Sequence, residues 1–126
     1  DSVLFPVNFT TWYESGFGPQ IMAEAERHGI YRLALKGAAH HGLSDRQDRV
    51  REKCWYAPIE DSELMALALR WTLSQPVTAV IPPGDPELWK MAVELAQNFT
   101  SINSDEEAIL KNEARGKRPL FQLAHS

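Results

Sequence analysis

The sequence predicts an α/β domain with three parallel strands, because three short apolar runs each lead into a segment of helical character. These runs span residues 3–9, 30–35 and 77–81. The predicted order is strand, helix, strand, long loop, helix, strand, helix and helix. Strands that alternate with helices in this way favour a parallel sheet joined by right-handed crossovers. The 126 residues fit a single domain and contain no internal repeat.

The first run is almost continuously apolar, which is typical of a strand covered on both faces. Pro6 lies within this run and cannot donate a hydrogen bond to a neighbouring strand. We therefore expect the first strand to lie away from the centre of the sheet.

Two helices are bounded by residues that favour helix ends. The first begins at Pro19, whose fixed φ suits the first helical position, and it ends at Gly29. The second runs from residue 61 or 62 to residue 75 and is followed by Pro76. Its apolar side chains recur three and four positions apart, which predicts one buried face.

Two further helices follow the third strand. Asp85 is predicted to cap a helix whose first residue is Pro86. Ser104 and Glu107 are predicted to form a capping box at the start of the last helix, which ends at Gly116.

Residues 37–60 are predicted to form a long loop within a single partial domain of residues 1–126. This segment is polar, charged and rich in residues that interrupt regular structure. A loop of this length in a compact fold is usually functional or mobile. We expect it to form a lid or the wall of a cleft.

Composition excludes several classes of function. Seventeen acidic and thirteen basic residues give a net charge of -4, without the basic stripe that binds a nucleic acid. No apolar run approaches the roughly 20 residues that cross a bilayer. Cys54 is the only cysteine, so no intrachain disulfide can form, and a reducing compartment, the cytoplasm, is predicted.

The histidines at positions 40 and 41, together with Cys54, allow two chemical interpretations. Metal binding is disfavoured, because adjacent loop histidines point apart and one thiolate leaves a zinc site short of four ligands. Cys54 could act as a nucleophile activated by His40 or His41. A structural loop cysteine next to Trp55 and Tyr56 is the simpler interpretation. We therefore predict no metal ligand and no catalytic residue.

Two aromatic pairs follow candidate strands. Trp12 and Tyr13 form the first pair, and Trp55 and Tyr56 form the second. Large amphipathic rings at this side of an α/β sheet can stack on a ligand or can pack over the sheet. The sequence leaves these alternatives open.

The strand ends carry a possible anion site. Lys36 and Gly37 end the second strand, and Pro83 and Gly84 lie in the turn after the third. A lysine beside small residues can meet a phosphate or carbonyl oxygen close to the backbone. The turn opens onto a helix N-terminus, whose amide groups favour anions. Asp85 competes for these amides, and its role as a helix cap is the stronger interpretation.

Several segments resemble the aldo-keto reductase family. Residues 67–84, LALRWTLSQPVTAVIPPG, followed by a Pro-Glu pair, are similar to a signature near the C-terminus of that family. Residues 33–39, LALKGAA, resemble the motif of its seventh strand, and residues 3–9 resemble its sixth strand. Residues 17–30 fit the unit between these two strands, so the resemblance covers nearly the whole chain.

The resemblance implies the C-terminal part of a (β/α)8 TIM barrel that reduces a carbonyl with hydride from a nicotinamide cofactor. The chain would hold the last three strand–helix units and the C-terminal helix. The family's catalytic Asp, Tyr, Lys and His lie on the first four strands, so no residue here inherits a catalytic role and the chain alone is predicted to be inactive. The implied partners are the cofactor, a small carbonyl substrate, and the remaining barrel segment or a second copy.

The resemblance also implies four cofactor-binding residues. Lys36 and Gly37 would lie beside the nicotinamide or the pyrophosphate, and Pro83 and Gly84 would face the adenosine phosphate. The acidic residues that follow would repel a 2′-phosphate, so both NADP and NAD are candidate cofactors.

A second hypothesis is a stand-alone, non-catalytic α/β module. Three parallel strands leave two unpaired edges, which such a module could cover by self-association or by binding a partner through its aromatic loops. The abrupt start of the chain on an apolar strand favours the reductase segment.

Overall fold

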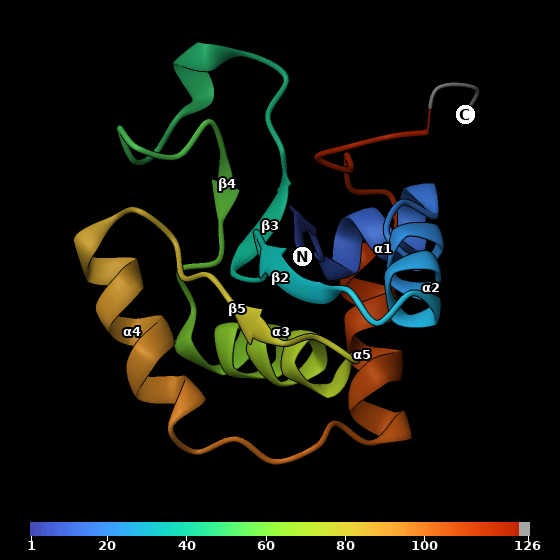
Figure 1. Ribbon diagram of the computed structural model, residues 1–126. Coiled ribbons are helices and arrows are strands. Elements are labelled where there is room, and N and C mark those ends of the chain that lie inside the picture. The colour runs from blue at the N-terminus through green and yellow to red at the C-terminus, as the bar shows by residue number, and fades with distance from the viewer. Residues whose placement is uncertain (124–126) are drawn as a thin grey trace.

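The computed structural model describes residues 1–123, which form a mixed α/β fold (Figure 1). Strands β1 (Ser2–Pro6), β2 (Tyr31–Leu35) and β5 (Ala79–Val80) form a parallel sheet in the order β1-β2-β5. The predicted α/β class with three parallel strands is confirmed. Pro6 lies on an edge strand, as the missing amide donor requires.

Four helices lie where the sequence predicts them: α2 (Pro19–Arg27), α3 (Ser62–Ser74), α4 (Pro86–Ala96) and α5 (Ser104–Ala114). The capping role of Asp85 is confirmed, because its carboxylate accepts hydrogen bonds from the amides of Glu87 and Leu88. Within residues 1–123, no helix is long and apolar enough to cross a membrane.

The predicted capping box of α5 is wrong by one residue. The box is formed by Asn103 and Glu106, and not by Ser104 and Glu107. The Asn103 side chain accepts from the amide of Glu106, and the Glu106 side chain accepts from the amide of Asn103. Asn103 has an extended backbone with φ −104° and ψ 173°, whereas Ser104 is already helical. An asparagine caps a helix at least as well as a serine, so the sequence allows a capping box that starts at residue 103 or at residue 104.

The predicted first strand is too long, and a helix was missed. β1 ends at Pro6, and α1 (Phe9–Ser15) begins two residues later with Asn8 as its N-cap. The apolar pattern continues past the strand because Val7 and Phe9 are buried in the core. The continuous run of apolar residues therefore indicates that the segment is buried, and it does not indicate that the whole segment is a strand.

The segment predicted as a long loop contains a hairpin. β3 (Ala39–Gly42) and β4 (Tyr56–Pro58) pair antiparallel, and the 3-10 helix η1 (Arg46–Asp48) lies between them. The pairing register shifts between Ala39 and His41. These strands are short and irregular, so they leave no alternation of apolar and polar residues in the sequence. Figure 1 shows the hairpin rising beyond the ends of β2 and β5.

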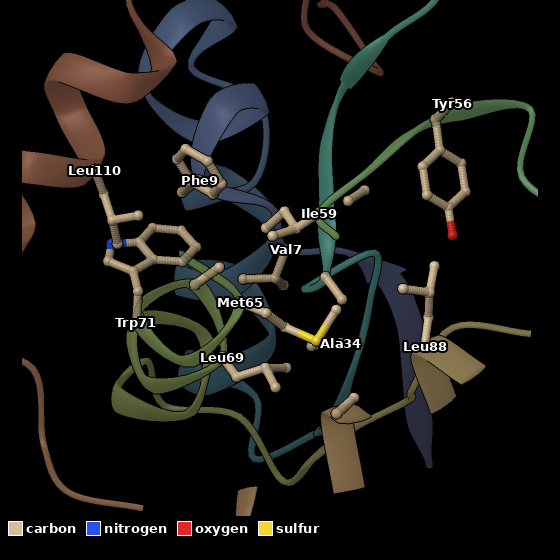
Figure 2. Packing of buried hydrophobic residues seen from close by; sticks show 14 of the residues in the cluster. Val7, Phe9, Ala34, Tyr56, Ile59, Met65, Leu69, Trp71, Leu88 and Leu110 are labelled. Atoms are coloured by element: carbon tan, nitrogen blue, oxygen red, sulfur yellow. The ribbon is translucent and has the colours of Figure 1, made fainter. Parts of the chain in front are cut away.

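The core lies on one face of the parallel sheet. Phe5, Ala34 and Val80 share a row across the three strands, and Ala34 lies near Met65 and Leu69 of α3 (Figure 2). Alternate residues point to the opposite face. That face is apolar and uncovered among the described residues, with 52% of Leu4, 63% of Tyr31 and 38% of Ile81 exposed.

Candidate functional site

Lys36 occupies a strained position at the carboxyl end of the central strand β2. Its φ is 65°, and no other non-glycine residue within 1–123 has a positive φ. A side chain in this left-handed region costs roughly 1–2 kcal/mol. The surrounding structure must therefore hold the turn in place.

The buried Asn8 holds this turn. Its Nδ2 donates to the carbonyl oxygens of Lys36 and Ala39 at 3.1 and 2.6 Å, and its Oδ1 accepts from the amide of Thr11 at 2.9 Å. One side chain thus joins the start of α1 to the turn after β2. The strained lysine is positioned by a residue far away in the sequence.

The Lys36 ammonium lies against two aromatic rings. Its Nζ is 4.7 Å from the centre of the Tyr56 ring and 5.5 Å from that of Trp55, within the range of cation–π attraction. Burial lowers the pKa of Lys36, and the nearby Cys54 opposes this effect. A partly desolvated ammonium at a strand end is suited to bind an anion or a carbonyl oxygen.

The structure brings together three of the four predicted cofactor-binding residues. Lys36, Pro83 and Gly84 line one cleft of about 40 Å³, together with Tyr56 and residues that end β2 and β5. This volume is far below the roughly 300–1,000 Å³ of a complete ligand pocket. The three residues therefore line a small cleft and not a complete ligand pocket.

Gly37 is not part of this cleft. A Cβ atom at this position would lie 3.1 Å from Oγ1 of Thr72 and 3.4 Å from Cγ1 of Val80. The missing side chain allows α3 to approach the sheet closely. Gly37 thus has a packing role in this structure.

The N-terminus of α4 is closed by charged side chains. Asp85 accepts from two amides of the helix, and hydrogen bonds from these amides and from Arg51 lower its pKa, the amide of Leu88 contributing most. Arg51 also binds Glu87 at 3.0 Å and Glu60 at 2.6 Å, and these carboxylates raise its pKa. An anion at this helix end would have to displace Asp85.

Arg51 carries no signal in the sequence that marks it as part of this site. It lies in the hairpin, 34 residues from Asp85, and no local spacing marks the contact. Only the folded chain shows that Glu60, before α3, and the two acidic residues at the start of α4 bind the same arginine.

The two histidines do not meet Cys54 as a catalytic pair. Nε2 of His40 lies 2.9 Å from Oε1 of Glu113, and Nδ1 of His40 lies 2.9 Å from Nδ1 of His41. Cys54 is buried. The pKa of Tyr56 is raised by burial first and then by its side-chain hydrogen bond with Cys54. Within residues 1–123, no three His, Cys, Asp or Glu side chains are arranged to hold a metal ion.

The first aromatic pair is a packing feature. Trp12 and Tyr13 lie on α1, where the Trp12 ring meets Trp71 edge to face at 5.4 Å. Nε1 of Trp71 donates to the Tyr13 hydroxyl at 2.9 Å. These rings pack α1 against α3.

The second aromatic pair divides between the core and the surface. Tyr56 is buried, whereas 43% of Trp55 is exposed. Trp55 is therefore the aromatic residue of this region that remains accessible to a ligand.

Comparisons with known proteins add no relative. No family model matches the sequence, and neither a curated protein nor a solved structure is significantly similar to it.

Proposed function

We propose that the chain forms the cofactor-facing last three strand–helix units of an aldo-keto reductase-like barrel that reduces a carbonyl with a nicotinamide cofactor. The observation that carries this proposal is the asymmetry of the parallel sheet. Helices cover one face, and the other presents Leu4, Tyr31 and Ile81 to solvent. In a closed barrel that second face is the packed interior, which explains apolar side chains there.

The two sides of the sheet support the same proposal. Beside β1, Val3, Ile21 and Ala25 line an open apolar hollow of about 520 Å³. Beside β5, a second hollow of about 110 Å³ lies between α3 and α4. In a barrel, a neighbouring strand–helix unit packs against each side. The remaining units of the barrel are the occupants that fit both hollows and the open face.

The cleft at the strand ends has a role in this proposal. Ligands of parallel α/β sheets bind outside the carboxyl ends of the strands, where Lys36 and Gly84 lie. Lys36 would donate a hydrogen bond to an oxygen of the cofactor. No atom lies within 4 Å of a Cβ built on Gly84, so the backbone there is open to close approach. The bound cofactor supplies the hydride.

The resemblance to the family assigns the proton donor to earlier strands. A carbonyl that accepts hydride also needs a proton from a positioned acid. We therefore expect this chain to bind part of the cofactor and to reduce no carbonyl by itself.

Fluorescence titration with NADPH and NADH tests the proposal. Lys36→Gln should weaken binding about tenfold or more, the loss expected for one charge-assisted hydrogen bond. Lys90→Gln removes the same charge from an exposed position on α4 and should bind like the wild type.

Two results would contradict the proposal. One is carbonyl reduction by the pure 126-residue chain. The other is a stable dimer in sedimentation that binds neither dinucleotide, which would favour the stand-alone, self-associating module.

A further inference from the structure

A further pocket lies at the tip of the hairpin. It has a volume of about 270 Å³, and Arg46, Arg49 and Trp55 line it together with residues 43–45. It shares no lining residue with the cleft at the strand ends. Figure 1 shows this tip as the part of the hairpin farthest from α3 and α5.

Two guanidinium groups of this pocket have almost no partners. The side chain of Arg46 makes no hydrogen bond or ion pair with any residue in the range 1–123. Arg49 makes one long hydrogen bond, 3.3 Å, to the carbonyl oxygen of Glu52. Arg51, close by in the sequence, binds three carboxylates. The hairpin thus has one arginine neutralised by acids and two that are available to an anion.

The acidic residue of the pocket does not neutralise these cations. The carboxylate of Asp45 accepts a hydrogen bond from the amide of Gln47 at 3.0 Å and so caps η1. Arg46 and Arg49 therefore leave the pocket with a net positive charge. Their planar guanidinium groups match the two oxygens of a carboxylate, and they lose less hydration on binding than an ammonium does.

Trp55 supplies a rigid apolar wall. Its ring meets Tyr56 edge to face at 5.3 Å and Phe121 edge to face at 5.9 Å. These contacts fix the indole while 43% of the residue stays exposed. Lys36 lies 5.5 Å from the same ring and adds positive charge behind it. A flat ligand ring can stack on such a surface.

We propose that this pocket binds a small planar carboxylate, with its ring against Trp55 and its carboxylate on Arg46 and Arg49. The volume of about 270 Å³ lies just below the roughly 300–1,000 Å³ of ligand pockets, which suits a single-ring acid. A tetrahedral phosphate would leave the indole unused. The site is separate from the proposed reductase function, because binding here needs neither cofactor nor turnover.

Calorimetric titration of the full chain with benzoate tests the proposal. Benzoate should bind saturably, and benzamide, its neutral analogue, should not. Arg46→Gln together with Arg49→Gln should weaken benzoate binding about tenfold or more, because two charge-assisted contacts are lost. Arg27→Gln together with Arg115→Gln removes the same charge from exposed positions elsewhere and should leave binding unchanged.

The aromatic wall has its own matched pair of variants. Trp55→Ala should weaken benzoate binding severalfold, whereas Trp89→Ala, which removes an indole of similar exposure from α4, should not. Circular dichroism confirms that each variant is folded before titration.

Four outcomes would overturn the proposal: benzoate that does not saturate the wild type, equal affinity in the Arg46/Arg49 double variant, equal losses in the two double variants, or inorganic phosphate that binds as tightly as benzoate. NADPH binding is measured separately, so either proposal can fail while the other stands.

Discussion

Asn8 holds the turn at Lys36 through its side-chain hydrogen bonds. It is buried and bonds to Lys36, Ala39 and Thr11. Asn8→Ala leaves two carbonyl groups and one amide without this partner, so we expect a loss of about 2–3 kcal/mol in the free energy of unfolding. Urea denaturation measures it. The control is Asn98→Ala, because the exposed Asn98 begins a second Asn-Phe-Thr triplet, and it should lower the free energy of unfolding little. Equal losses of stability in the two variants would contradict the role of Asn8.

His41 makes the stability of the chain depend on pH. Burial, His40 and Lys117, in that order, lower its pKa below the usual 6.5. At acidic pH the unfolded chain takes up a proton at His41 more readily than the folded chain does. The stability that neutral His41 gives to the folded chain is therefore fully present above about pH 6.5 and is lost as the pH falls below that value.

Urea unfolding between about pH 5 and 8 measures this dependence. His41→Gln should reduce the loss of stability on the acidic side. His28→Gln, an exposed position at the end of α2, should retain that loss. If the two variants show the same dependence as each other, His41 is not its source.

At the scale of elements, Arg51 fastens the hairpin to α4. It joins Glu60, Asp85 and Glu87 across segments that are separate in the sequence. Arg51→Gln should let the amides of residues 39–58 exchange hydrogen severalfold faster, while the amides of β1 and β2 keep their rates. Arg46→Gln removes the same charge from the same hairpin without breaking a described contact. Faster amide exchange in both variants would show that the loss of positive charge causes the effect, and not the loss of the ion pairs of Arg51 with α4.

The elements differ in how well the sequence predicts them. α4 was predictable because Asp85 and Pro86 are local signals that act within one turn of the helix. The hairpin was not, because pairing of Ala39 with Pro58 depends on contacts between segments. α1 was hidden because buried apolar residues around Pro6 suit a strand as well as a helix start.

The whole molecule presents one uncovered apolar sheet face. Without the rest of the proposed barrel, this face should make the chain self-associate as its concentration rises. Leu4→Lys places a charge in the face and should suppress association in sedimentation velocity. Ile109→Lys is the matched control, because Ile109 on α5 is 52% exposed, as is Leu4. Equal behaviour of the two variants would show that association does not use the sheet face.

The candidate site was only partly predictable at this scale. Lys36, Pro83 and Gly84 could be placed in advance, because the carboxyl ends of parallel strands gather at one edge. The packing role of Gly37, and the contacts of Lys36 with Trp55 and Tyr56, could not be read from spacing.

The sequence by itself determined the α/β class and the parallel direction of three strands, because strands that alternate with helices along a chain pair in parallel through crossovers. It also determined the four helices with strong end signals, because helix ends depend on neighbours within a few residues. Only the tertiary structure decided which side chains meet. Asn8 reaches the turn at Lys36, Arg51 reaches α4, and Trp55 lines the hairpin pocket while its ring lies 5.5 Å from Nζ of Lys36. Such contacts join residues tens of positions apart, and they form only when burial of the core has brought those segments together.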